Sequence, residues 1–294
     1  MVICAPRRRP CWTSWRDGTA DVACGGWIAL RLALGITYRG TAYHGWQSQP
    51  DGCTVQDHLE KALTQFAVAP IQTVCAGRTD TGVHGLNQVV HFDTDRARDP
   101  FSWVRGTNRY LPGDIAVQWC VPVADDFHAR NLARGRRYAY IVVESPVKPS
   151  IDRGSVGWTF RPLDGEAMRR AALHLIGEHD FSAFRSADCQ ALSPVKLMRE
   201  ITIERHGAYW RFDFEAVAFL HHMIRNLMGC LIAVGTGTRP SDWVAEVLAS
   251  RRRERAAPTF APDGLYFLGP RYDAHHGLPT RTAGFDWLPG GWQR

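Results

Sequence analysis

The residues best suited to chemistry lie in a polar, glycine-punctuated stretch over residues 77–85. This stretch combines one carboxylate, Asp80, with the guanidinium of Arg78 and the hydroxyls of Thr79 and Thr81. A carboxylate in such a loop can act as a nucleophile toward an electrophilic carbon. It can also be an Asx residue that only shapes the turn. Spacing alone leaves both interpretations open.

Two common site classes do not fit this stretch. The Lys and the following Ser or Thr of a phosphate-binding P-loop are missing. His84 and His91 are seven residues apart, and no Cys-x-x-Cys pair accompanies them, so the spacing does not indicate a metal site. The pattern therefore predicts neither a nucleotide phosphate cradle nor a bound metal, and we expect no cofactor.

The elements around Asp80 predict a compact α+β unit over residues 27–124. Alternating apolar residues over 30–36, the β-branched run over 88–94, and residues 71–74 and 115–121 are typical of strands. Thr54 and Asp57 form a capping-box pattern that opens an amphipathic helix, and residues 101–108 indicate a second helix. Asp80 would then lie on a loop at the rim of a strand, where site residues usually occur.

A second α+β unit is predicted over residues 125–272. Strands are expected over 135–143, 198–205, 209–216 and 264–268, with helices running from Asp164 to a stop at Gly177 and over 219–234. The last helix carries His221 and His222, whose side chains would point about 100° apart and so would not chelate one metal. Arg225 on the same, mostly apolar, helix needs a partner because a buried guanidinium alone is unfavourable.

Composition limits the class of protein further. The formal net charge of +6 fits an anionic partner. Eight scattered cysteines without metal or redox spacing fit a reducing cytoplasm, and no apolar run is long enough to span a membrane. Residues 1–26 and 273–294 lack periodicity, so we expect a disordered extension and a tail.

Several motifs resemble those of the tRNA pseudouridine synthase A family. The strongest are Ala-Gly-Arg-Thr-Asp-Thr-Gly-Val-His-Gly around Asp80 and His-His-Met-Ile-Arg-Asn-Leu-Met-Gly around Arg225. Weaker matches include Arg-x-Tyr at Tyr138 and Phe-His-Ala-Arg over residues 127–130, and the resemblance covers residues 28 to about 272. It implies a pseudouridine synthase fold of two similar domains, each an antiparallel sheet with helices on one face, and an active-site cleft between them.

The resemblance also implies roles for single residues. Asp80 is the expected nucleophile, attacking either C1′ of the ribose or C6 of the uracil, and Arg225 is expected to pair with it and aim it. Tyr138 is expected to stack on the uracil, and its hydroxyl is a candidate to assist proton transfer at C5. Arg78 is expected to fill the space left by a flipped base or to hold a phosphate. Further substrate contacts are expected from a set of neighbouring residues: His84, Phe127, His128 and Arg130.

The function implied is isomerisation of uridine to pseudouridine at positions 38 to 40 of the tRNA anticodon stem-loop. The partners implied are tRNA and a second copy of the chain in a homodimer, in the cytoplasm. Two alternatives remain: a catalytically silent RNA-binding protein of the same fold, and a hydrolase that uses Asp80 on a glycosidic bond. Retaining glycosidases pair the nucleophile with a second acid, which the Asp80 loop does not supply.

Overall fold

The computed structural model describes residues 30–280 and residue 285. The expected extension over residues 1–26 lies outside this range, as do residues 281–284 and 286–294 of the expected tail. None of the helices in the described ranges has the length and apolar character that a bilayer crossing demands.

In the first half of the chain, the described residues form four strands and two helices. In chain order these are β1 (Leu30–Tyr38), α1 (Val55–Ala67), β2 (Val74–Cys75), β3 (His84–Thr94), α2 (Pro100–Asn108) and β4 (Ile115–Pro122). Strand β1 lies between β3 and β4 and is antiparallel to both. The predicted capping box is confirmed, because Thr54 and Asp57 each bond the backbone N–H of the other at the start of α1.

The second half contributes six strands and three helices. They are β5 (Gly135–Glu144), β6 (Gly157–Thr159), α3 (Gly165–Leu173), β7 (Gly177–Asp180), β8 (Val195–His206), β9 (Tyr209–Ala216), α4 (Met223–Gly235), α5 (Trp243–Ser250) and β10 (Leu265–Arg271). Short 3-10 turns occur at Gly40–Ala42, Ser182–Phe184, Arg253–Arg255 and Ala274–His276.

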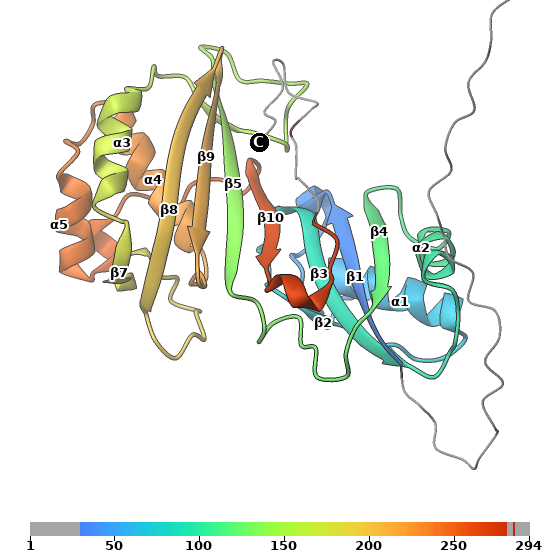
Figure 1. The fold of residues 1–294 in the computed structure, drawn as a ribbon. Coiled ribbons are helices and arrows are strands. Elements are labelled where there is room, and N and C mark those ends of the chain that lie inside the picture. Colours follow the sequence, from blue (N-terminus) through green and yellow to red (C-terminus); the bar gives the residue numbers. More distant parts are fainter. Residues whose placement is uncertain (1–29, 281–284, 286–294) are drawn as a thin grey trace, which may run out of the picture.

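All ten strands of the described residues belong to one sheet that runs through both halves, in the order β4-β1-β3-β10-β5-β9-β8-β7, with β2 on β3 and β6 on β5 (Figure 1). The last strand, β10, joins the halves. It is parallel to β3, with Phe267 opposite Gly85, and antiparallel to β5, with Phe267 opposite Tyr138. The predicted α+β class is confirmed, while the parallel pairings β10–β3 and β5–β6 are additions to the expected antiparallel pattern.

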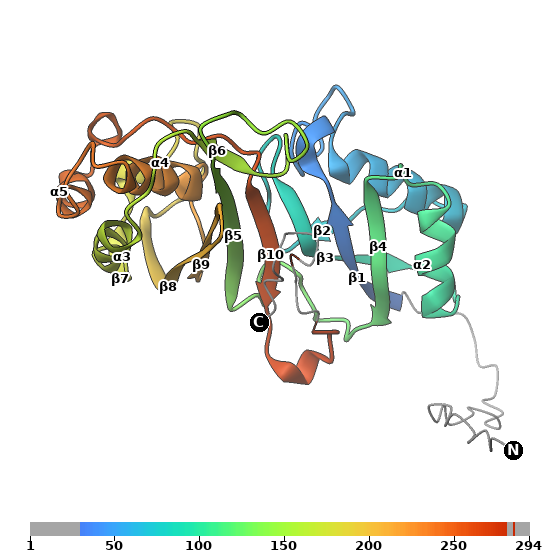
Figure 2. The ribbon, with the colours of Figure 1, turned by 90° about the horizontal axis from the view of Figure 1, so that it is seen from above.

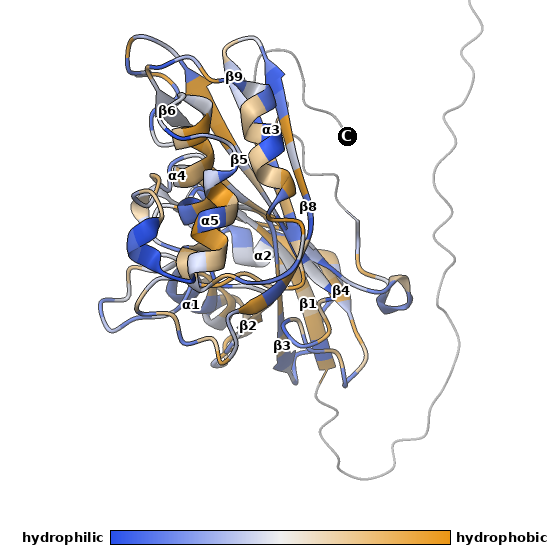
Figure 3. Ribbon diagram, turned by 90° about the vertical axis from the view of Figure 1, so that its left-hand side faces the viewer, coloured by the Kyte–Doolittle hydropathy of each residue, from blue (hydrophilic) through white to orange (hydrophobic). Residues whose placement is uncertain are grey.

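The five α-helices of the described chain cover one face of the sheet (Figure 2). Helices α1 and α2 pack on β1, β3 and β4, whereas α3 and α4 pack on β5, β8 and β9, and α5 packs against α3. Helix α4 is mostly hydrophobic along its length (Figure 3), as expected for a helix enclosed by α3, α5 and the sheet. The opposite face carries two smaller clusters, in which Phe127 and Phe285 are fully buried.

Several predicted boundaries differ from the structure; the strand expected over 88–94, for example, begins at His84, four residues earlier. The strand expected over 71–74 is reduced to β2, because backbone N–H groups of this segment bond to side chains of α1 instead of to a neighbouring strand. Ile71 N donates to Thr64, and Thr73 N donates to Glu60. Helix α3 ends at Leu173, because the chain turns there to bury Leu175, and Gly177 opens β7 with a φ of +109°. Helix α4 begins at Met223, four residues later than predicted.

Candidate active site

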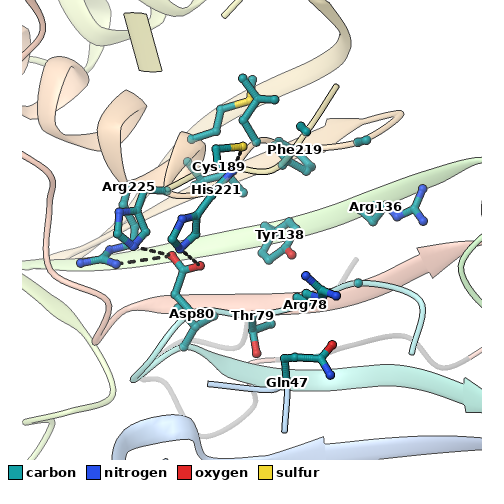
Figure 4. A pocket seen from close by; sticks show the side chains of 18 of the residues that line it. Gln47, Arg78, Thr79, Asp80, Arg136, Tyr138, Cys189, Phe219, His221 and Arg225 are labelled. Carbon is teal, nitrogen blue, oxygen red and sulfur yellow. Dashed lines mark hydrogen bonds and ion pairs between the residues drawn. The ribbon is translucent and has the colours of Figure 1, made fainter. Parts of the chain in front are cut away.

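A cleft of about 900 Å³ opens where the two halves meet on the helix-covered face. The first half contributes the Asp80 loop and part of residues 44–49. The second half contributes β5 side chains, residues 188–191 and residues 218–225 (Figure 4). The cleft therefore combines residues that are distant in the sequence.

The Asp80 loop is held by the last residue of β1 and by the segment that follows this strand. Trp46 N donates to the Thr79 carbonyl at 3.0 Å, and the Tyr38 hydroxyl lies 2.8 Å from Thr79 Oγ1. Gly45 makes this approach possible, because its φ is +85° and a Cβ there would lie 2.7 Å from the Thr79 carbonyl oxygen. The buried Thr79 thus anchors the loop and leaves the next side chain, Asp80, in the cleft.

Three basic side chains surround the Asp80 carboxylate (Figure 4). Arg225 Nη1 lies 3.4 Å from Oδ2, and Arg225 Nε donates to the Phe260 carbonyl at 3.0 Å. His221 Nε2 lies 3.5 Å from Oδ1, and His222 Nε2 lies 3.6 Å from Oδ2. The structure therefore brings together Asp80 and Arg225, as the sequence analysis expected, and adds two histidines.

The expectation that these histidines diverge is wrong. It assumed that both lie within a helix, whereas α4 begins after them and His222 has left-handed backbone angles, with a φ of +60°. Both imidazoles consequently face Asp80, with ring centroids 4.0 Å apart. Burial lowers the pKa of His222, outweighing the Asp80 carboxylate, which raises it.

The carboxylate and the two imidazoles come within the reach of one metal ion, since their ligand atoms lie within 4.8 Å of one another. The guanidinium of Arg225 contacts the same carboxylate and opposes a second cation there. We therefore describe this group as a carboxylate held by three basic side chains.

Tyr138 forms an aromatic wall of the cleft. It lies on β5, is 7% exposed, and packs against Phe219 and Phe267 with ring centroids 5.2 and 4.9 Å away. Burial raises the pKa of its phenol well above the ordinary value. The hydroxyl therefore holds its proton firmly near neutral pH.

Arginines form the other end of the cleft. Arg78 and Arg130 line it and are exposed, as expected of substrate contacts. Arg136 was not predicted, although it shares a strand face with Tyr138 at a spacing of two residues. Its Nη2 donates to the Ala76 carbonyl at 2.9 Å, which ties β5 to the start of the Asp80 loop.

Three other predicted contact residues lie outside the cleft lining. His84 is buried; Gly40 N donates to its Nδ1, and its Nε2 donates to the Asp263 carbonyl, both at 3.1 Å. Phe127 is buried on the opposite face of the sheet. His128 Nδ1 accepts from the backbone N–H groups of Arg130 and Asn131. These placements favour structural roles for all three residues.

An α+β sheet whose halves enclose a carboxylate beside an aromatic wall is the arrangement that the sequence motifs led us to expect of a pseudouridine synthase. A family model described as "tRNA pseudouridine synthase" matches residues 36–130 and 171–273, which hold the Asp80 and Arg225 motifs. The chain belongs to this tRNA pseudouridine synthase family and is an isomerase.

Close relatives agree with this assignment. A protein named tRNA pseudouridine synthase A from Methylibium petroleiphilum is 73% identical over 260 residues, covering 88% of this chain and 100% of the relative. One of the same name from Polaromonas naphthalenivorans is 66% identical, with the same shares covered. A solved Cbf5-Nop10-Gar1 complex aligns at 12% identity with a TM-score of 0.30, over 68% of this chain and 45% of that chain, too weakly to carry an argument.

Proposed function

We propose that this chain isomerises uridine to pseudouridine in tRNA, at positions 38 to 40 of the anticodon stem-loop, with Asp80 as the nucleophile. The observation that carries the proposal is the Asp80 carboxylate, held in the cleft beside Tyr138 with both oxygens facing basic side chains. The names of the relatives support tRNA as the substrate. The Asp80 and Arg225 motifs of the sequence support the choice of uridines.

The cleft residues suggest which side chain performs each step of the isomerisation. Asp80 attacks C1′ of the ribose or C6 of the uracil, and Arg225 orients it because its Nε is fixed on Phe260. The target base is unpaired and swings out of the stem, at a free-energy cost of a few kcal/mol. Its uracil stacks on Tyr138 in this proposal, while Arg78 and Arg130 hold phosphates or fill the vacated space.

We also propose that the enzyme works in the cytoplasm as a homodimer that binds one tRNA across both subunits. The cysteines of the described chain are all free thiols, which fits a reducing compartment. The resemblance of the Asp80 and Arg225 motifs supports the dimer.

A second acid, Asp188, lines the same cleft, so hydrolysis of the glycosidic bond needs its own test. Unmodified tRNA labelled with tritium at C5 of uridine is incubated with wild type, Asp80→Asn and Asp95→Asn, and both tritium release and free uracil are measured. Asp95 is an exposed residue that pairs with Arg96, so its variant is the matched control.

Isomerisation predicts tritium release and pseudouridine formation by wild type and Asp95→Asn, none by Asp80→Asn, and no free uracil. Free uracil would indicate a hydrolase. Tight tRNA binding by the folded wild-type protein without tritium release would indicate an RNA-binding protein without this activity.

A further inference from the structure

The left-handed backbone of His222 is not explained by helix capping. Among the described residues, the non-glycine positions with positive φ are Val68, His222 and Arg251. Val68 and Arg251 follow the last turns of α1 and α5, where left-handed residues are common. His222 instead precedes α4, where an extended residue is usual, and its side chain caps no helical N–H. A residue with a Cβ is strained in the left-handed conformation, because its Cβ lies too close to the following carbonyl oxygen.

This conformation brings two consecutive side chains onto one carboxylate. In a continuous helix the side chains of His221 and His222 would diverge by about 100°. The left-handed turn instead places one Nε2 near each oxygen of Asp80, at 3.5 and 3.6 Å (Figure 4).

The backbone around the turn is held from both sides. His221 N donates to Cys189 Sγ at 3.4 Å, and Ser186 N donates to the His221 carbonyl at 3.1 Å. The His222 carbonyl accepts from Asn226 N at 2.9 Å. Strain that surrounding contacts maintain is typical of a functional position.

The reaction needs a group that can take and return a proton. Once C5 of the uracil has formed its bond to C1′ of the ribose, C5 still carries its hydrogen atom. N1 of the uracil has no hydrogen atom at that point. Asp80 serves as nucleophile in the proposed function, Arg225 has no free lone pair to accept a proton, and the buried Tyr138 phenol keeps its own. His221 and His222 both have Nε2 beside Asp80 in the cleft, but the strained left-handed backbone is that of His222, and burial favours its neutral, proton-accepting form over the pull of Asp80.

We propose that His222 is the proton carrier of the isomerisation, an inference that rests on the proposed function of Asp80. The electron pair of the C5–H bond becomes the C5–C6 double bond, and the proton passes to Nε2 of His222. The π-electron pair of the N1=C6 double bond returns to N1, and N1 then takes the proton from the His222 imidazolium. Nothing is oxidised or reduced. His221 and Arg225 position the carboxylate and the imidazole for this exchange.

The test is tritium release from C5-labelled tRNA by His222→Gly, with added imidazole. Glycine adopts the left-handed angles without strain, so the variant should fold with unchanged or higher thermal stability. Release should fall about 100-fold or more, the usual contribution of general acid–base catalysis. Imidazole in the vacated space should restore it at least about tenfold, in proportion to its neutral fraction. The control variant is Val68→Gly, which removes the same left-handed backbone strain at the end of α1. It should release tritium at the wild-type rate.

Two further variants separate the possible outcomes. His222→Asn suits the left-handed turn and keeps a polar contact but cannot carry the proton, so it should be as slow as His222→Gly. Wild-type release by His222→Gly or His222→Asn would overturn the inference, as would a loss that imidazole leaves unchanged. If Asp80→Asn remains silent in those cases, the proposed function stands. Release by Asp80→Asn would instead overturn the proposed function itself.

Discussion

The contacts around Asp80 are longer than ordinary hydrogen bonds, and this bears on what they do. Its partners lie 3.4 to 3.6 Å away, and the side chains involved are 15 to 38% exposed. Partly exposed ion pairs of this kind add roughly 0 to 1 kcal/mol to stability. Their main effect is therefore to orient the carboxylate rather than to stabilise the fold.

Arg225 offers a direct test of that orientation. Its Nε is fixed on the Phe260 carbonyl while Nη1 reaches Asp80, a two-point arrangement that Lys cannot reproduce. We expect Arg225→Lys to lower kcat about 10- to 100-fold, with a smaller effect on KM, because the charge stays but the aim is lost. Steady-state tritium release measures both constants, and Arg96→Lys, in an exposed pair with Asp95, is the control. An unchanged kcat would show that charge alone suffices.

The sequence predicts that Arg225 pairs with Asp80, but it does not predict that His221 and His222 also face Asp80. This difference has a physical reason. A guanidinium on an apolar helix must find a partner, which is a general requirement. The backbone just before the left-handed His222 is held by contacts of His221 with Cys189 and Ser186, which lie more than 30 positions away in the chain, so no local pattern predicts this turn. The apolar residues before Met223 continue the helical spacing and conceal the boundary.

At the scale of elements, β3 shows what periodicity can and cannot predict. Its alternation puts Val90 and Phe92 on the helix-covered face and Val89 and His91 on the other. That division follows from the sequence. The sequence does not predict which segment covers His91, because residues 127–129 reach it from the second half of the chain.

The burial of His91 makes stability depend on pH. Burial, aided by the nearby Arg31, lowers its pKa to about 4. The unfolded chain, with an ordinary pKa near 6.5, therefore binds the extra proton between these values. The contribution of His91 is thus complete above about pH 6.5 and is lost as pH falls toward 4.

We expect the free energy of unfolding of wild type to drop by up to about 3 kcal/mol more than that of His91→Asn between pH 7 and pH 4. Asn suits this site because its Oδ1 can accept from Ala129 N, as His91 Nδ1 does at 3.2 Å. Urea unfolding across this pH range measures the difference, with His275→Gln on an exposed turn as the control. Parallel curves for wild type and His91→Asn would show that His91 does not titrate on unfolding.

On the scale of the whole molecule, the cleft exists because β10 joins the halves. The sequence predicts two α+β units with the site between them, since the Asp80 and Arg225 motifs fall one in each. That the last strand would pair parallel to β3 and antiparallel to β5 could not be predicted, because each pairing joins residues more than 120 positions apart and depends on long-range packing. This junction puts Leu265 in the cleft wall beside Tyr138 and Asp80.

The positive charge of the molecule should contribute to tRNA binding at the same cleft. The chain carries a formal net charge of +6, and the exposed Arg78 and Arg130 line the cleft without an ion pair to any described residue. If they neutralise tRNA phosphates, affinity falls with salt through counterion release, and each lost contact lowers the slope of log Kd against log salt by about 1.

We therefore expect Arg78→Gln and Arg130→Gln each to reduce that slope by about 1 in a binding titration, and the double variant to reduce it by about 2. Arg105→Gln removes the same charge from an exposed position on α2, the helix at the β4 edge of the sheet (Figure 1), and should leave the slope unchanged. Equal reductions at all three positions would place the tRNA across the whole basic surface. Unchanged slopes for Arg78 and Arg130 would remove both from the phosphate contacts and leave base stacking on Tyr138 as the main source of affinity in the cleft.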